Sequence, residues 1–434
     1  MHVAIVGNSA AGLSALESFR ARDQRSRVTL ISSEAGPAYS RVLLPYYLRR
    51  RLSRDRLFIR EMAYYAGQDV EVMFETRVEQ VDAARRSLEF TDGRCLGFDR
   101  LLLATGSRPT KPPVAGLDGP GVHHLWTLED ALRLDRLFRE GARVLILGAG
   151  FVALQAAWAA RRRGLDVTVI ELAEQILPRV LDASAASVLH DRILEHGVAV
   201  HTRTRTDAVE RDRHGAMRVF ATGLDPFTVD LVIVGTGVRP NDGLLAEALE
   251  PGRQGIPVAA TMETTVEGIF AAGDVARAPT ANGGPREIHA LWPTAVEQGR
   301  VAGANLAGAG VAYDGSLSMN VTEMFGVTVG SLGRIAEDQG DDVVVRSDLA
   351  GIEHLKVVSR AGAPVGALVI GGHEGAALLG RLRPYVRQRR PVPDVRDLID
   401  RRDLDQRLVG AVARRRRGSR LEAPKEEPRC ASLR

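Results

Sequence analysis

Short apolar runs alternating with helical stretches mark the start of the chain and predict an α/β fold. Val3–Val6 is a β-prone apolar run, Gly7–Gly12 (GNSAAG) is a tight turn of small residues, and Leu13–Arg20 has helical character. A second apolar strand, Arg27–Ser33, ends at Glu34. Continuous apolar runs of this kind are typical of strands buried in a parallel sheet, so the pattern predicts a βαβ unit.

The same pattern returns independently in the middle of the chain. Arg143–Leu147 is an apolar strand, Gly148–Ala153 (GAGFVA) is the turn, and Leu154–Arg163 is the helix. The next strand, Asp166–Ile170, again ends at a carboxylate, Glu171. Two units of this kind in one chain are much stronger evidence for a repeated binding device than a single glycine pattern.

Each turn fits the fingerprint that binds the pyrophosphate of a dinucleotide at a helix N-terminus. The second glycine of the first fingerprint is Ser9, and the third glycine of the second is Ala153; both residues remain small. Glu34 and Glu171 are placed to accept the hydroxyls of an adenosine ribose. The alternative for the first unit alone is a buried strand and helix of an unrelated α/β fold.

Glu171 also bears on the choice of nicotinamide cofactor. A carboxylate at this position binds a free ribose 2′-hydroxyl and repels a 2′-phosphate, which favours NAD over NADP. No arginine follows it directly, although Arg179 remains a residue that could reach a 2′-phosphate.

After Tyr313 the pattern changes to short strands separated by glycine turns, which predicts a separate α+β domain. We expect these strands at Val327–Leu332, Asp342–Arg346, Glu353–Val358 and Ala367–Ile370. The predicted architecture is α/β, with two Rossmann-like three-layer dinucleotide-binding domains, the second inserted in the first, and a C-terminal α+β domain. The expected ranges are 1–112 with 241–310, then 113–240 for the inserted domain, 311–380 for the C-terminal domain, and 381–434 for a basic helix and tail.

Composition narrows the class of protein. The 434 residues are 45% hydrophobic and 26% charged, which is ordinary for a globular protein. No apolar run approaches the roughly 18 residues of a membrane span, and the first strand begins too early for a signal peptide. Cys95 and Cys430 are too few for a disulfide framework or a four-thiolate cluster. We therefore expect a cytoplasmic protein.

The positive charge is concentrated at the end of the chain. Residues 381–434 hold 17 Lys and Arg against 8 Asp and Glu, a net charge of +9, whereas the whole chain carries +4. Arg414–Arg417 could contact nucleic acid, a membrane or an acidic protein, but a solvated, partly disordered chain end is the commoner explanation of such a run. No aromatic residues are interleaved with these arginines, so we expect no nucleic-acid partner.

Two further motifs complete a recognisable set. Ala104–Gly106 (ATG) follows a buried strand, and Gly273–Asp274 follows another. With both fingerprints in this order, residues 1 to about 380 resemble the FAD-dependent pyridine nucleotide–disulfide oxidoreductases. Tyr39–Leu48 (YSRVLLPYYL) is similar to the branch with rubredoxin reductases, oxygenase ferredoxin reductases and the flavin part of NADH nitrite reductases.

The resemblance implies FAD and NAD(H) as cofactors and assigns residues to each. The first fingerprint would hold FAD, and the inserted one would hold NAD(H). The implied FAD-binding residues are Gly7, Ser9, Ala10, Ala11, Gly12, Glu34, Arg41, Val78, Thr105, Gly106, Asp274 and Trp292. The implied NAD-binding residues are Gly148, Gly150, Phe151, Val152, Ala153, Glu171, Gly235 and Gly237. The C-terminal domain resembles the interface domain of the family, which implies a homodimer or a hetero-oligomeric complex.

The absence of thiols points to the reaction class. Disulfide reductases of this family carry CxxxxC near residues 40–50, where this chain has no cysteine. What remains is hydride exchange between NAD(H) and flavin, followed by single-electron transfer to or from an iron–sulfur or similar protein. The chain would act alone or as the NAD-linked subunit of a larger aldehyde, 2-oxoacid or nitrite oxidoreductase. The alternatives are an NADH oxidase using oxygen or a small acceptor, and a non-catalytic nucleotide-binding subunit.

Four residues are candidates for the neighbourhood of the flavin. Related ferredoxin reductases have a lysine and a glutamate where this chain has Tyr46 and Gln155, so we expect a neutral, hydrogen-bonded nicotinamide pocket unless both residues only pack. Arg41 is the expected cation near the flavin or its phosphates, with a surface salt bridge as the alternative. Trp292 is expected to pack by the flavin ring or in interdomain core. No catalytic residue is assigned, and no metal-ligand spacing occurs among the histidines.

Overall fold

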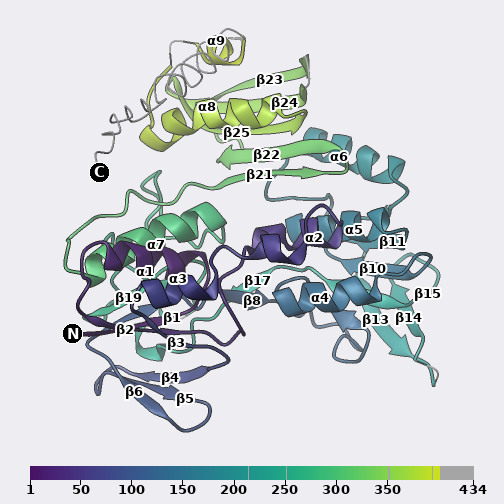
Figure 1. Ribbon diagram of the computed structural model, residues 1–434. Coiled ribbons are helices and arrows are strands. Elements are labelled where there is room, and N and C mark those ends of the chain that lie inside the picture. Colours follow the sequence, from purple (N-terminus) through teal and green to yellow (C-terminus); the bar gives the residue numbers. More distant parts are fainter. Residues whose placement is uncertain (214, 251, 350–351, 393, 401–434) are drawn as a thin grey trace, which may run out of the picture.

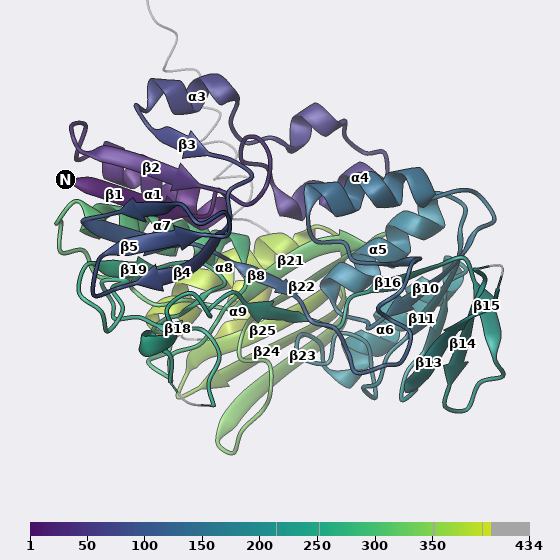
Figure 2. The same cartoon turned by 90° about the horizontal axis from the view of Figure 1, so that it is seen from below.

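The computed structural model describes residues 1–400 except for 214, 251, 350–351 and 393. Two parallel α/β units lie side by side, and an antiparallel sheet covers both of them along one side (Figure 1). Seen from below, this sheet spans the junction between the two units (Figure 2). Arg414–Arg417, Cys430 and most of the expected C-terminal helix lie outside the described residues.

The first unit contains a five-stranded parallel sheet in the order β19-β7-β1-β2-β3. Its strands are β1 (His2–Val6), β2 (Arg27–Ile31), β3 (Glu71–Met73), β7 (Arg100–Leu103) and β19 (Ile269–Ala271). Helices α1 (Ala10–Arg20) and α7 (Trp292–Leu306) cover one face, and α3 (Met62–Gly67) lies by β3. The other face carries an antiparallel layer of β4 (Val78–Asp82), β5 (Ser87–Phe90) and β6 (Cys95–Gly97). The expected βαβ unit is therefore present.

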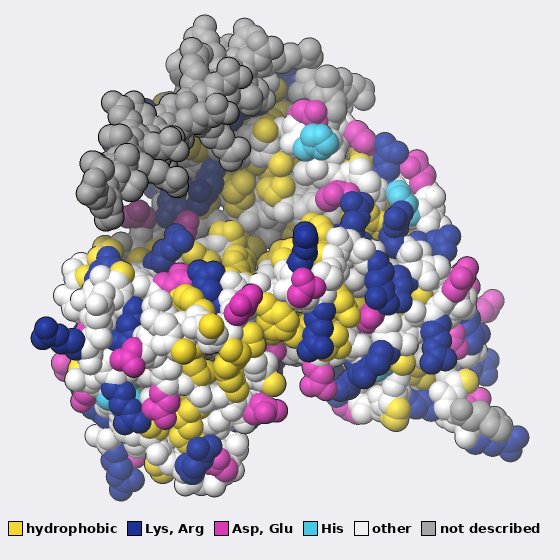
Figure 3. All heavy atoms as spheres, viewed as in Figure 1, with side chains coloured by type: hydrophobic (Ala, Val, Ile, Leu, Met, Phe, Trp, Pro, Cys, Tyr) yellow, Lys and Arg dark blue, Asp and Glu magenta, His cyan; other side chains and the backbone are white. Residues whose placement is uncertain are grey.

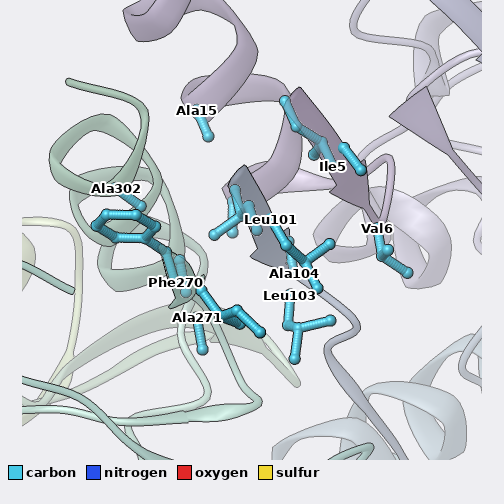
Figure 4. Packing of buried hydrophobic residues seen from close by; sticks show 14 of the residues in the cluster. Ile5, Val6, Ala15, Leu101, Leu103, Ala104, Phe270, Ala271 and Ala302 are labelled. Carbon is cyan, nitrogen blue, oxygen red and sulfur yellow. The ribbon is translucent and has the colours of Figure 1, made fainter. Parts of the chain in front are cut away.

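Fully apolar strands explain why this sheet is buried on both faces. Ile5, Leu101 and Leu103 have no exposed surface, and Ala15 and Ala302 meet them from the two helices (Figure 4). Small residues on the helices let the helix axes approach the sheet closely, which fixes where α1 begins relative to the end of β1.

The second unit repeats this design with a parallel sheet in the order β12-β11-β10-β16-β9. Its strands are β9 (Val122–His123), β10 (Arg143–Leu147), β11 (Asp166–Ile170), β12 (Ala199–His201) and β16 (Leu231–Val234). Its helices are α4 (Leu128–Leu137), α5 (Phe151–Arg162) and α6 (Ala183–Glu195). A small antiparallel sheet adds β13 (Thr206–Arg211), β14 (Met217–Ala221) and β15 (Phe227–Val229).

Two crossing segments join the units. Just before the expected domain boundary at residue 112, the chain forms strand β8 (Ser107–Pro109), which pairs with β17 (Val238–Pro240). The Thr105 hydroxyl donates to the Asn241 carbonyl at 2.9 Å, and the Asn241 amide donates back to the Thr105 carbonyl at 2.9 Å. The sequence missed this pairing because prolines at strand ends resemble loop prolines.

The remaining short elements of the two units lie in loops. They are η1 (Arg41–Leu43), α2 (Leu44–Leu48), η2 (Arg54–Leu57), η3 (Ala246–Ala248), β18 (Ile256–Pro257) and β20 (Ala276–Arg277).

The C-terminal sheet is antiparallel, in the order β21-β22-β25-β24-β23. Its elements are β21 (Met319–Met324), β22 (Val327–Gly333), β23 (Asp341–Leu349), β24 (Ile352–Arg360), β25 (Ala363–Gly371), α8 (Glu374–Gln388) and α9 (Val395–Asp400). We did not predict strand β21 or helix α8 from the sequence. Helix α8 runs through residue 380, where we ended this domain, because Leu382 and Val386 are buried with the sheet.

The contact between α1 and α7 depends on two glycines of α7. A Cβ on Gly299 would lie 2.3 Å from the Ala11 carbonyl oxygen, and one on Gly303 would lie 2.2 Å from that of Ala15. Both distances are far inside van der Waals contact. The first half of α1 is thereby held against the second half of α7.

Replacing one of these glycines should loosen the first unit. We expect Gly303→Ala to lower the free energy of unfolding by about 1–3 kcal/mol, because α7 must move away from α1. Gly67→Ala at the end of α3 is the control, since a Cβ there meets nothing within 4 Å. Urea unfolding of both variants measures the difference; equal stability of the two would contradict this account of the packing.

Candidate functional site

A cavity of about 2050 Å³ lies where the three parts of the chain meet. It exceeds the roughly 300–1,000 Å³ of a pocket for one drug-sized ligand. Its walls come from the first fingerprint turn, the first turns of α5 and α7, and the strand β21. In the space-filling view the surface is hollowed between the first unit and the C-terminal sheet, and hydrophobic side chains gather there (Figure 3).

The first fingerprint forms a cradle of bare backbone at this cavity. Gly7 has φ +120°, and a Cβ on it would lie 2.1 Å from the Ala104 carbonyl oxygen. A Cβ on Gly12 would lie 1.8 Å from the Gly7 carbonyl oxygen, so Gly12 allows the close packing of helix on strand. Ser9 is the N-cap of α1 but makes no side-chain cap, which leaves the first helical N–H groups available to an anion.

Glu34 lies at the end of β2, as expected, and is held by two partners. The Tyr39 hydroxyl donates to it at 2.5 Å, and Arg41 forms an ion pair with it. The Arg41 guanidinium also donates to the Trp126 carbonyl at 2.7 Å. Burial raises the pKa of Tyr39, so this phenol remains a proton donor at neutral pH. Arg41 thus lines the cavity, but its guanidinium is bound to Glu34.

Asp274 also lines the cavity and accepts a hydrogen bond from the Ser107 hydroxyl at 2.7 Å. The turn before it is fixed because the Gly273 N–H donates to the Gln298 side chain at 2.8 Å. Burial raises the pKa of Asp274, an effect that the Ser107 hydrogen bond and the charge of Arg41 reduce.

Several other expected FAD residues lie on the same walls. Trp292, at the start of α7, lines the cavity next to a helix N-terminus that no side chain caps. Ser9, Ala10, Ala11, Val78, Thr105 and Gly106 also line it, whereas Gly12 packs behind the turn.

The second fingerprint has the same backbone construction. Gly148 has φ +96°, and a Cβ on Gly235 would lie 2.8 Å from the Ala153 Cβ. Glu171 accepts the N–H of Ala149 at 2.6 Å and that of Ala173 at 2.8 Å. Of the expected NAD residues, the cavity is lined by Phe151 and Val152; its walls do not include Gly148, Gly150, Ala153, Glu171, Gly235 or Gly237.

Tyr46 and Gln155 share one wall between the two fingerprints. The Gln155 amide donates to the Thr322 hydroxyl at 2.8 Å and to the Glu323 carbonyl at 2.9 Å, while its own oxygen has no partner. Neither residue is charged, and the neutral, hydrogen-bonded nicotinamide pocket stays a prediction; Arg49, which does not line the cavity, packs against Tyr46. The buried guanidinium of Arg49 lies 4.3 Å from the centre of the Tyr46 ring.

The sequence concealed Arg49 because it begins a run of three arginines, which we interpreted as part of a basic helical stretch. Arg49 follows Tyr46 by one helical turn, and this spacing could have indicated that the two side chains lie next to each other. Among the described residues no cluster of His, Cys, Asp and Glu could hold a metal ion, and none of their helices is long and apolar enough to cross a membrane. Among the residues that the structure describes, no cysteine lines the cavity.

The raised pKa of Asp274 predicts a pH-dependent gain in stability on substitution. Above its ordinary pKa, the folded state bears the cost of burying the charged carboxylate, and below it that cost vanishes. We therefore expect Asp274→Asn to raise the melting temperature of the ligand-free protein at pH 7. The gain should shrink as the pH falls towards 4; a loss of stability at pH 7 would contradict the assignment.

Comparisons with known proteins identify the family of the chain. A family model described as pyridine nucleotide-disulphide oxidoreductase matches residues 1–299. The chain is 32% identical over 363 residues to the NADH-dependent phenylglyoxylate dehydrogenase subunit epsilon of Aromatoleum evansii, covering 83% of this chain and 86% of that protein. It is 30% identical over 347 residues to an NADH oxidase of Methanocaldococcus jannaschii, covering 77% of each.

A solved structure has a similar fold. The covalent putidaredoxin reductase–putidaredoxin complex contains a chain that matches with a TM-score of 0.84 and 25% identity, over 95% of this chain and 99% of that one. With two Rossmann-like units around one cavity, the chain belongs to the pyridine nucleotide–disulphide oxidoreductase family and is an FAD-containing, NAD(P)H-dependent oxidoreductase.

Proposed function

We propose that this enzyme exchanges a hydride between NAD(H) and FAD and passes single electrons to or from an iron–sulfur protein. The observation that carries the proposal is the single cavity reached both by the first fingerprint and by the first turn of α5. When bound, FAD supplies the step between two-electron and one-electron chemistry. The chain's own residues bind and orient the two cofactors and keep water away.

The fit to FAD rests on complementary groups at several points of the cavity. The free N–H groups at the start of α1 suit a pyrophosphate. Only glycine fits at position 7, because a Cβ there would clash with the Ala104 carbonyl oxygen. Glu34 is placed to accept ribose hydroxyls, which would compete with its bonds to Tyr39 and Arg41. The uncapped start of α7, beside Trp292, offers a positive dipole end to the electron-rich edge of the flavin.

The fit to NAD(H) rests on the uncapped start of α5. Gly150 is its N-cap and carries no side chain, so Phe151 and Val152 present backbone N–H groups to a pyrophosphate. Glu171 would accept the ribose hydroxyls in place of the two backbone N–H groups that it now holds. Its negative charge supports NADH over NADPH.

The nature of the electron acceptor is inferred from chemistry and from relatives. A cavity without cysteine in its walls supports electron transfer rather than dithiol chemistry. The putidaredoxin complex supports a small iron–sulfur partner, and the phenylglyoxylate dehydrogenase subunit supports a role as the NAD-linked subunit of a larger 2-oxoacid oxidoreductase. Assembly with such a partner or as a homodimer, and a cytoplasmic location, belong to the same proposal.

A second candidate function is that of an NADH oxidase. It is favoured by the 30% identity to the Methanocaldococcus jannaschii NADH oxidase. In that case oxygen or a small molecule would take the electrons, and a protein partner would be unnecessary.

Anaerobic reduction followed by offered acceptors tests these functions. We expect NADH to bleach the flavin absorbance fully, and a [2Fe–2S] ferredoxin to reoxidise it at least tenfold faster than air-saturated buffer. Faster reoxidation by oxygen would favour the oxidase. Flavin that NADH does not reduce would refute both functions and leave a non-catalytic nucleotide-binding subunit.

The role of Glu171 gives a separate prediction. Glu171→Ala should raise the KM for NADH about tenfold, because a hydrogen bond to a charged group contributes about 1.5–3 kcal/mol. The KM for NADPH should change less, so the preference for NADH narrows. Glu174→Ala, which removes an exposed carboxylate of the same loop, is the control. An unchanged ratio of the two KM values would contradict the assignment.

A further inference from the structure

Arg49, the residue that follows helix α2, is a buried cation held between two aromatic rings. Its guanidinium carbon lies 4.3 Å from the centre of the Tyr46 ring and 3.9 Å from that of the Trp158 ring. Only 8% of the residue is exposed. These contacts bring α2 of the first unit against α5 of the second.

The charge of Arg49 is not neutralised by an ion pair with any carboxylate in the part of the chain that the structure describes. Its Nε and Nη2 atoms are buried without a hydrogen-bond partner. Burial lowers the pKa of Arg49, an effect that Tyr46 and, less strongly, the exposed Glu323 oppose, and a guanidinium remains protonated in proteins. Removing a cation from water without a partner is costly, and such costs are concentrated at functional sites.

Arg49 is linked to the cavity through residues that line it. Tyr46 stacks on Arg49 and also lines the cavity, whereas Arg49 itself does not. Trp158 is one turn of α5 after Gln155, which also lines the cavity and has a buried oxygen without a partner. The guanidinium therefore lies directly behind the wall that Tyr46 and Gln155 form.

We propose that Arg49 is a positioning residue that acts through Tyr46 and Trp158. Its stacking holds the wall of the cavity, and its unpaired charge favours the negative charge that flavin gains on reduction. This inference rests on the proposed function only in placing the flavin ring against this wall. In this arrangement Arg49 supplies a positive charge near the flavin, which Tyr46 cannot do because it is uncharged.

Charge and stacking can be separated by substitution. Arg49→Lys keeps the charge but loses the planar stacking, whereas Arg49→Met loses the charge and keeps a long side chain. Arg51→Met is the matched control, because it removes an exposed arginine of the same run. The measurements are the two-electron midpoint potential of the bound flavin and the melting temperature of each variant.

We expect Arg49→Met to shift the ratio of reduced to oxidised flavin about tenfold towards oxidised, equivalent to a potential about 30 mV lower. Arg49→Lys should keep the potential of the unmodified protein while its melting temperature falls. Arg51→Met should change neither value, since its charge is screened by solvent.

Two results would overturn the inference. One is a potential of Arg49→Met equal to that of Arg51→Met; the other is a potential of Arg49→Lys lowered as far as that of Arg49→Met, which would reduce Arg49 to a packing residue. If Arg49→Met does not fold, the comparison of Arg49→Lys with the unmodified protein decides. Failure of the proposed function is distinct, because it appears in the unmodified protein as flavin that NADH does not reduce.

Discussion

The close approach of backbone to backbone at the first fingerprint is the constraint on which the site depends. Gly7 and Gly12 allow β1, its turn and α1 to pack with carbonyl oxygens where any other residue would place a Cβ. Gly299 and Gly303 bring α7 against α1 by the same means. Two helix N-termini without side-chain caps consequently face one cavity, where only a ligand or water can satisfy their N–H groups.

Much of this arrangement was predictable from the sequence because it depends on local rules. Buried parallel strands are continuous apolar runs, and a turn that needs bare backbone must be built from small residues, so both fingerprints and the carboxylates Glu34 and Glu171 were found. Helix α8 was missed although it packs mainly on β25, the strand that precedes it. The pairing of β8 with β17 was missed because it joins segments far apart in the chain. No local pattern reports such contacts.

Arg49 shows the same limit within the site. The sequence shows that Tyr46 and Gln155 are uncharged, but it does not show that the guanidinium of Arg49, one turn after Tyr46, is buried against the Tyr46 ring. Whether an arginine is solvated or buried is decided by Trp158, more than 100 residues later in the chain. Asp274, in the wall of the cavity, provides a second charge that is costly to bury. Such costs are expected where a protein binds a charged cofactor.

The central claim is that FAD and NAD(H) meet in this one cavity, and a crystal structure of the protein with FAD and NAD⁺ tests it most directly. We expect the flavin ring to lie between the start of α7 and the wall formed by Tyr46 and Gln155, with the nicotinamide stacked on the flavin. The pyrophosphates should lie at the starts of α1 and α5. A flavin ring bound outside the cavity, or a nicotinamide too far from the flavin for hydride transfer, would contradict the account.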